Sequence, residues 1–202
     1  MQRKEFFQLL LKRYSPADLL LVQHAYWLAK EGHRQQKRDT GERYFEHVRS
    51  VAVLCIEHGF DDPETVVLAL LHDGKEDTFI PPSVYLSLFG REIAHAIGVL
   101  SKSIPMFDDV CGNVIGYLKK DTAKYFAEIA LLPPKFRIVK GEDRLHNHRT
   151  SDTMKVDRLK RHLEESRKWI LPLMDATEPR VSTLILNEIV RHETRLGLVP
   201  SM

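Results

Sequence analysis

Four side chains of two kinds, imidazoles and carboxylates, occur in a pattern that suits a metal site. His72 and Asp73 are adjacent, His47 precedes them, and Asp143 follows them. Neutral imidazole and carboxylate are ordinary ligands for divalent ions such as Mn²⁺, Fe²⁺ or Zn²⁺. An isolated His-Asp pair is a weak signal, because a lone histidine or aspartate is more often a hydrogen-bonded core residue. The sequence around these residues therefore has to decide between ligand and structural roles.

The His-Asp pair follows a segment that predicts an internal helix. Asp62-Pro63-Glu64 is typical of a helix start, because aspartate caps the first turn and proline fits its geometry. The next residues, 66–71, are apolar without exception. A helix that is apolar on all sides lies inside a protein. It would deliver His72 and Asp73 to a buried position, where charge is costly unless it is paired or bound to a metal.

Two further carboxylates lie about one helical turn beyond the pair. Glu76 is four residues after His72, and Asp77 is four residues after Asp73. A helix that continues through Gly74 would place both acids beside the metal. Carboxylates next to a metal-bound water can orient it and take its proton. The alternative, that the two acids cap a helix end or face solvent, is less favoured at this spacing.

The chain as a whole predicts an all-α protein. Ser15-Pro16-Ala17-Asp18 starts a helix, residues 32–42 form a loop, and an apolar stripe over 48–56 ends at Gly59. No run has a convincing strand period. Segment 103–113 is expected to be irregular and to lie over the site. Further helices are expected over 82–90, 93–100, 114–131, 135–149, 154–170 and 178–195.

Composition limits the class of protein. The 202 residues are 43% hydrophobic and 29% charged, which suits one folded domain, and the formal net charge is only +2. No strong basic excess points to nucleic acid. The two cysteines, Cys55 and Cys111, are too far apart to suggest a thiolate site. No signal peptide or membrane span is evident, so we expect a soluble cytoplasmic protein without membrane contact.

Three separated segments together resemble the hydrolase domain of the alarmone synthetase/hydrolases and of the small stand-alone alarmone hydrolases. HRQQKRDTGERYFEH (33–47) is similar to the family's HxGQxRKxxGxxYxxHP segment. ALLHDGKEDT (69–78) is similar to ALLHDxxEDT, and VKGEDRLHNHRT (139–150) to IKLADRLHNxRT. Phe89-Gly90 also falls where the family has a helix-ending FG. The resemblance covers roughly residues 20–170 and implies an all-α HD-domain helical bundle.

The resemblance assigns roles by position. It implies a metal, typically Mn²⁺ with Fe²⁺ or Zn²⁺ as alternatives, on His47, His72, Asp73 and Asp143, with Glu76 and Asp77 activating water. The implied nucleotide contacts are Arg38, Tyr44, Lys140, Arg144, Asn147 and Thr150. Three of these keep a second interpretation. Arg144 is as well explained by a structural ion pair, Lys140 by a solvated helix position, and Tyr44 by packing.

The departures from the family pattern fall beside the ligands. Asp39 replaces a lysine, Arg43 and Val48 each replace a proline, and Gly141-Glu142 replaces Leu-Ala. None removes a ligand. Asp39 and Glu142 add negative charge where a polyanionic nucleotide would bind, so they favour a different substrate.

The expected function is removal of the 3′-pyrophosphate from guanosine or adenosine tetra- and pentaphosphate alarmones. The alternatives are an HD phosphohydrolase for another nucleotide or phosphorylated metabolite, and a non-catalytic alarmone-binding module. We expect a single domain over 1–202, with a core of about 15–175 and a helical extension of about 176–202. This length leaves no room for a synthetase half, so we expect hydrolysis only. The apolar stripe of the extension is expected to pack on the core, with a homodimer contact as the alternative.

Overall fold

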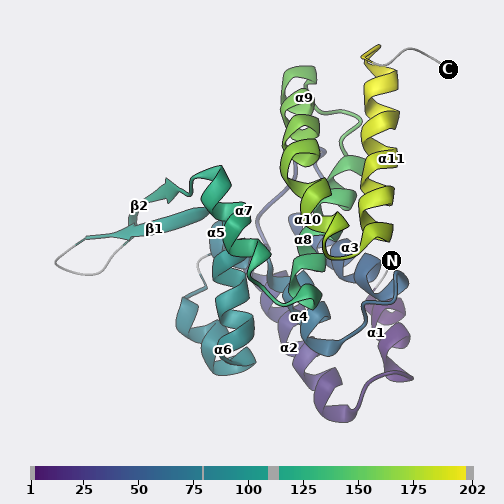
Figure 1. The fold of residues 1–202 in the computed structure, drawn as a ribbon. Coiled ribbons are helices and arrows are strands. Elements are labelled where there is room, and N and C mark those ends of the chain that lie inside the picture. The colour runs from purple at the N-terminus through teal and green to yellow at the C-terminus, as the bar shows by residue number, and fades with distance from the viewer. Residues whose placement is uncertain (1–2, 79, 109–113, 199–202) are drawn as a thin grey trace.

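The computed structural model describes residues 3–78, 80–108 and 114–198 (Figure 1). These residues form helices and one small hairpin, so the all-α prediction is confirmed. The N-terminal helices are α1 (Arg3–Leu11), α2 (Pro16–Gly32), α3 (Tyr44–Glu57), α4 (Pro63–Leu71), α5 (Gly74–Asp77) and α6 (Pro82–Leu100). The later helices are α7 (Thr122–Ala130), α8 (Pro134–Arg149), α9 (Val156–Glu165), α10 (Leu171–Asp175) and α11 (Pro179–Arg195).

Helix α4 lies at the centre of the protein. Its residues from Thr65 to Leu71 are at most 1% exposed, because α2, α3, α6 and α8 surround it. The Asp62 side chain accepts hydrogen bonds from the backbone N–H groups of Glu64 and Thr65. That cap satisfies donors that would otherwise be unpaired at a helix end. The prediction of an internal helix leading to the His-Asp pair is confirmed.

The helix that carries the pair does not run unbroken into the two following acids. α4 ends at Leu71, His72 and Asp73 form a turn, and α5 begins at Gly74. The backbone angles of His72 (φ −58°, ψ −33°) remain helical, so the chain keeps its direction. The Cα of Gly74 also faces the Tyr85 ring, whose oxygen lies only 2.4 Å from where a Cβ would stand. A glycine here lets α5 approach α6.

The two-stranded antiparallel hairpin differs from the expected structure. β1 (Ser103–Phe107) pairs with β2 (Val114–Lys119), from Ser103 opposite Lys119 to Phe107 opposite Val114. The sequence predicts an irregular segment followed by a helix from residue 114, and this prediction is wrong for the residues that the structure describes. The hairpin projects from the helices (Figure 1), and Ile115, Tyr117 and Leu118 in β2 are 50–66% exposed. With apolar residues exposed, the strand lacks the alternation by which half-buried strands are recognised.

The helix expected over 154–170 consists of three consecutive pieces. α9 is followed by a π-helical segment (Ser166–Ile170) and then by α10. Within the π-helical segment, the Trp169 ring stacks on Phe126 of α7, with ring centroids 5.5 Å apart and planes 1° apart. Met154 precedes α9 rather than lying in it.

The C-terminal helix α11 packs along α8, as the favoured interpretation of its apolar stripe predicted. Val181, Ile185 and Ile189 are all buried. Gly141 on α8 permits this close approach, because a Cβ there would lie 2.3 Å from Met174 Sδ and 3.0 Å from Val181 Cγ1. Gly141 stands where the family pattern has leucine, and its small size therefore allows the C-terminal segment to pack closely on α8.

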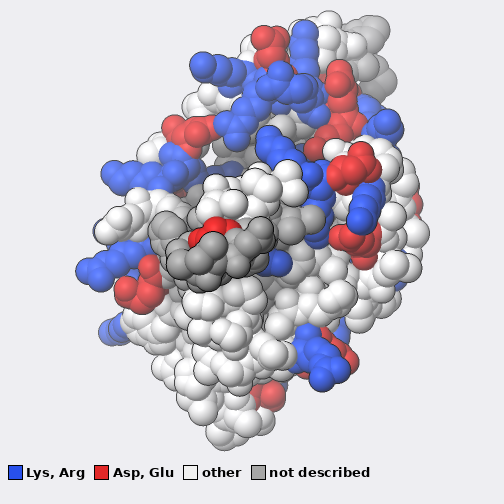
Figure 2. Space-filling view, turned by 90° about the vertical axis from the view of Figure 1, so that its left-hand side faces the viewer, with Lys and Arg blue, Asp and Glu red and all other residues white. Residues whose placement is uncertain are grey.

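The described surface mixes charges of both signs. On the face drawn in Figure 2, lysine, arginine and acidic side chains lie interleaved over the end that holds α9 and α11. The opposite end of that face is mostly uncharged. Among the residues that the structure describes, none of the helices combines the length and the apolar character that a membrane crossing needs.

We predict that Gly141→Ala lowers the free energy of unfolding by about 1–3 kcal/mol, because the added methyl group overpacks the contact with Met174 and Val181. The matched control is Gly98→Ala in α6, where the nearest atom to a Cβ is Lys75 Nζ at 3.7 Å. That change should raise stability by about 0.5–1 kcal/mol, since alanine favours helix over glycine. Urea unfolding measures both. Equal effects of the two substitutions would contradict the close approach at Gly141.

Candidate metal centre and the adjoining pocket

The four predicted ligands meet in one cluster. Suitable ligand atoms of His47, His72, Asp73 and Asp143 all lie within 4.8 Å of one another. They come from the first turn of α3, the end of α4 and the middle of α8, three helices that contact one another. The Nε2 atom of His47 lies 3.6 Å from Asp73 Oδ2 and 3.3 Å from Asp143 Oδ1. The Nε2 atom of His72 lies 3.1 Å and 3.7 Å from the same two oxygens.

The His72 ring is held so that its Nε2 atom faces the carboxylates. Its Nδ1 atom lies 2.8 Å from the carbonyl oxygen of Ala69 in α4. A carbonyl only accepts, so Nδ1 carries the hydrogen and donates it, which leaves the lone pair of neutral His72 on Nε2. This Nε2 atom is buried and, among the residues that the structure describes, makes no hydrogen bond of normal geometry. Buried polar atoms are normally partnered, so an imidazole nitrogen aimed at two carboxylates fits a metal ligand.

The His47 ring reaches the same arrangement through His146. Arg38 Nη1 lies 3.3 Å from His146 Nδ1, and a guanidinium only donates, so this nitrogen accepts. His47 Nδ1 lies 2.9 Å from the same atom and 3.5 Å from Arg38 Nη1, so the Nδ1 side of this ring is held away from the cluster. Burial, together with the nearby His47 and Arg38, lowers the pKa of His146 to about 3, so it stays neutral. His47 thereby also presents Nε2 to the cluster.

The electrostatics of the cluster call for a positive charge between the carboxylates. Burial alone would disfavour the charged forms, but Asp73 and Asp143 together raise the pKa of His72 to about 10. In turn, the imidazoles hold the pKa of Asp73 well below its usual range against the effect of burial. A bound divalent ion would supply that charge instead of a proton. The donor set, two imidazole nitrogens and two carboxylates, suits Mn²⁺, Fe²⁺ or Zn²⁺.

Two residues from the predicted nucleotide set, Tyr44 and Lys140, contact the metal-ligand carboxylates. The Tyr44 hydroxyl donates to Asp73 Oδ2 at 2.7 Å, and Lys140 Nζ donates to Asp143 Oδ2 at 2.7 Å. Lys140 is only 7% exposed, so its interpretation as a solvated residue is wrong. The carboxylate of Asp143 raises the pKa of Lys140 although burial opposes its charge. Such contacts fix the orientation of ligand carboxylates.

A pocket of about 750 Å³ adjoins the cluster. Its lining includes Lys37, Arg38, Asp39, Thr40, Tyr44, Asn147, Thr150, Ser151, Thr153, Met154, Lys155, Arg158 and His162. Arg38 crosses it to reach α8, donating to Asn147 Oδ1 at 2.6 Å and to Thr150 Oγ1 at 3.1 Å. Asn147 in turn donates to Asp143 Oδ1 at 2.6 Å, which fits the prediction that it shares the side of the fourth ligand.

The remaining predicted site residues lie elsewhere or outside the described side chains. Arg144 is buried and pairs with Glu165 of α9, as the structural interpretation of this residue stated. Glu76 and Asp77 belong to helix α5. The structure describes their backbone but not their side chains, so their catalytic role stays a prediction. Segment 103–113 is expected to lie over the site. The structure describes only residues 103–108 of this segment, and residues 103–107 form β1.

Two of the departures from the family pattern are balanced by partners. Asp39 pairs with Arg158 at the rim of the pocket. Glu142 is fully buried, and its Oε1 atom lies 2.7 Å from His58 Nδ1, at the C-terminal end of α3. Burial raises the pKa of Glu142, and His58 opposes that rise. The expectation that Glu142 adds charge to the nucleotide pocket is therefore wrong, because neighbours in a helix sequence point in different directions.

Sequence reasoning missed two imidazoles beside the cluster. His146 carries the hydrogen-bond link to His47, and His33 stacks on Tyr44 with ring centroids 4.9 Å apart. Both lie inside the segments that resemble the family. The available signal was spacing, since His146 is three residues after Asp143 and faces the same side of α8.

We predict one divalent metal ion per chain, and its loss in His72→Ala, because this change removes one of the four ligands of the cluster. The control is His24→Ala, at an exposed position on α2. Elemental analysis of dialysed protein measures both. Retention of metal by the His72 variant at the wild-type ratio would contradict the assignment of the cluster.

We predict a pH signature for the Arg144–Glu165 pair. Although burial opposes it, Arg144 and Lys102 lower the pKa of Glu165 to about 2, from 4.5. A carboxylate whose pKa is lower in the folded than in the unfolded protein stabilises the fold at pH values above its unfolded pKa. This stabilisation is lost as the pH falls from about 4.5 towards 2. Glu165→Gln should thus cost about 1–3 kcal/mol near neutral pH, and the difference from wild type should shrink towards pH 2. Its exposed neighbour provides the control, Glu164→Gln, for which unfolding should show little difference at either pH.

Comparison with known proteins gives the same picture. Residues 25–103 match the HD domain family. The chain is 34% identical over 166 residues to the GTP pyrophosphokinase rsh of Brucella melitensis, covering 81% of this chain and 21% of that protein. It is 31% identical over 175 residues to the guanosine-3′,5′-bis(diphosphate) 3′-pyrophosphohydrolase of Aquifex aeolicus, covering 84% and 23% respectively. The chain thus spans about a fifth of the length of these relatives.

A solved structure shares the fold over nearly its whole length. It is described as "A metazoan ortholog of SpoT hydrolyzes ppGpp and plays a role in starvation responses". The match has a TM-score of 0.69 at 22% identity and covers 89% of this chain and 97% of that one. The resemblance inferred from the sequence motifs is confirmed in this form: residues 25–103 match the HD domain family, and the chain is similar to proteins named for alarmone metabolism.

Proposed function

We propose that the chain is a metal-dependent phosphohydrolase that removes pyrophosphate from the 3′ position of guanosine tetra- or pentaphosphate. The observation that carries the proposal is the four-ligand cluster opening beside a pocket of about 750 Å³ with basic residues on its lining. A pocket of this size suits a nucleotide. Similarity to proteins named as a pyrophosphohydrolase of guanosine 3′,5′-bis(diphosphate) and as an ortholog that hydrolyses ppGpp supports the substrate class.

His47, His72, Asp73 and Asp143 would hold the ion, for which we propose Mn²⁺. When bound, such an ion lowers the pKa of a coordinated water and stabilises charge that develops on the phosphate. The chain's own residues prepare that site. Tyr44 and Lys140 orient the two ligand carboxylates, and Ala69 and His146 fix the two imidazoles.

The water must lose a proton when it attacks the 3′-linked phosphorus. We assign this step to Glu76 and Asp77, whose backbone in α5 follows directly after the ligand pair. The attack forms a bond between the water oxygen and the 3′-linked phosphorus and breaks the bond from that phosphorus to the 3′ oxygen. The departing 3′ oxygen takes up the proton that the acidic pair accepted from the water, so the products are pyrophosphate and a nucleotide with a 3′ hydroxyl group. Arg38, held by Asn147 and Thr150, places a guanidinium in the pocket for the nucleotide.

Asp39 and Glu142, the two acids that favoured a different substrate, now give little support to that alternative. Asp39 is paired with Arg158 at the pocket rim, and Glu142 is paired with His58 on another side of α8. The remaining pocket cations, which include Lys37, Arg38 and Lys155, favour a polyanionic nucleotide.

We predict that Asp73→Asn abolishes pyrophosphate release from guanosine tetraphosphate, because it replaces an anionic ligand of the proposed ion by a neutral amide. Circular dichroism checks that the fold is retained. Asp157→Asn, at an exposed position of α9 outside the pocket, is the matched control and should keep full activity. Activity in Asp73→Asn, or wild-type activity that is insensitive to chelation, would refute the proposed metal dependence.

We predict a different pattern for Glu76→Gln and Asp77→Asn. Each should lower kcat about 10²-fold or more, since a positioned general base contributes that much, while metal content stays at the wild-type ratio. Single-turnover assays and elemental analysis on the same preparations separate the two effects. Unchanged turnover in both variants would contradict this assignment and would mean that another group accepts the proton.

A further inference from the structure

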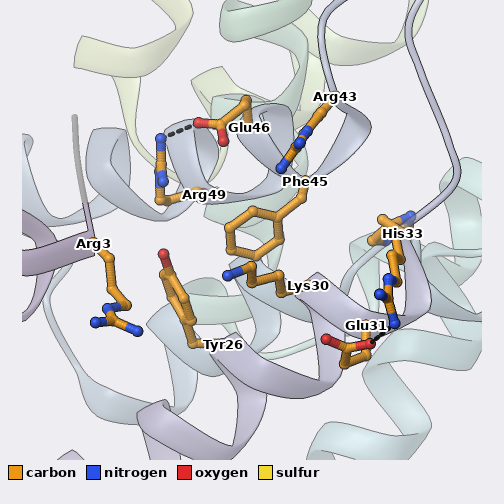
Figure 3. A pocket seen from close by; sticks show the side chains of 10 residues that line it. Arg3, Tyr26, Lys30, Glu31, His33, Arg43, Phe45, Glu46 and Arg49 are labelled. Atoms are coloured by element: carbon orange, nitrogen blue, oxygen red, sulfur yellow. Dashed lines mark hydrogen bonds and ion pairs between the residues drawn. The ribbon is translucent and has the colours of Figure 1, made fainter.

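A second cavity lies between α1, α2 and the start of α3 (Figure 3). Its volume is about 570 Å³. The lining residues are Arg3, Tyr26, Lys30, Glu31, His33, Arg34, Arg43, Phe45, Glu46 and Arg49. None of them lines the pocket beside the metal centre. The function proposed above makes no use of this cavity.

The lining is strongly basic. It has five arginine or lysine side chains against two glutamates. Arg49 pairs with Glu46, and Arg34 lies 3.6 Å from Glu31, so both acids are already engaged. Within the described part of the chain, neither Arg3, Lys30 nor Arg43 has a carboxylate partner.

Three unpaired cations from three separate segments converge on the cavity. Arg3 belongs to α1, Lys30 to α2, and Arg43 is the residue before α3. Figure 3 shows their side chains around the cavity, with the rings of Tyr26 and Phe45 among them. Arg3 and Lys30 also lie over the Trp27 ring, at 5.5 and 4.8 Å from its centroid. Such contacts hold the side chains in place but leave their charge uncompensated.

The inner wall of the cavity is rigid. Tyr26 and Phe45 are 1% and 5% exposed and contact each other edge to face, with centroids 4.9 Å apart. Since these rings are buried against each other, they offer little open face on which a base could stack. The recognition chemistry therefore lies in the guanidinium and ammonium groups, which bind phosphate oxygens through charge-assisted hydrogen bonds.

Arg43 is one of the positions at which the sequence departs from the family pattern that it resembles. It stands where the resembling family has proline, and no role in the metal centre accounts for it. Its backbone angles, φ −62° and ψ 133°, would also suit proline. The position therefore needs no arginine for its conformation, and the side chain is what the substitution adds.

We propose that this cavity is a second anion site that binds a small phosphorylated molecule through Arg3, Lys30 and Arg43. Di- and polyphosphate groups match it best, because their several oxygens can engage cations that come from three directions. The site stands independently of the hydrolytic function. It is close to the metal centre, since Arg43 precedes Tyr44 and His33 stacks on the Tyr44 ring.

The test uses inorganic pyrophosphate as the probe, in calorimetry with a chelator present. Pyrophosphate can also enter the metal pocket, so every protein carries Arg38→Ala, which removes the main guanidinium there. We expect this parent to bind one pyrophosphate. Adding Lys30→Glu and Arg43→Glu should weaken binding at least about tenfold, since two charge-assisted contacts are lost and two negative charges repel the probe.

The matched control reverses two exposed charges on α9, Lys160→Glu with Arg161→Glu, and should leave affinity within about twofold after the same change in net charge. A milder pair, Lys30→Gln with Arg43→Pro, covers a failure of the first pair to fold. It should weaken binding as well. Absence of binding to the parent, equal loss in the α9 control, or parent-like affinity in the cavity variants would each overturn the proposal.

Discussion

Two carboxylates and two imidazoles meet at the end of a helix that is almost wholly buried, with one ligand atom from each within 4.8 Å of the others. The rest of the site depends on how the charge of these carboxylates is balanced. Carboxylates in such a place need a compensating positive charge, since burial of unpaired charge is costly. Lys140 supplies one on the inner side, against Asp143. The open side, between Asp73, Asp143 and the two Nε2 atoms, is where a divalent ion would complete the balance.

The fold serves this constraint through contacts that leave each ligand little freedom. A backbone carbonyl of α4 fixes the ring of His72, and His146 of α8 fixes the ring of His47. The Tyr44 hydroxyl holds Asp73, and Asn147 links Asp143 to Arg38 in the pocket. Ligand geometry and pocket geometry are thus set by one hydrogen-bond network, as metal sites commonly show.

The ligands and the central helix could be predicted from the sequence because they depend on local rules. An apolar run with an aspartate cap makes a buried helix whatever surrounds it, and three motifs in order identified the cluster. Partners distant in sequence could not be predicted. Glu142 lies next to a ligand in the chain but points to His58, and the charge of Arg144 is matched by Glu165 of another helix. The exposed apolar residues of β2 likewise concealed a strand.

The central claim is that the cluster holds a catalytic metal for alarmone hydrolysis. The most direct measurement is the product balance of purified protein with guanosine tetraphosphate, taken with chelator and then with Mn²⁺ restored. Guanosine 5′-diphosphate and pyrophosphate are expected in equal amounts with Mn²⁺, and neither product is expected with chelator. Release that is independent of metal, or release of monophosphate in place of pyrophosphate, would contradict it.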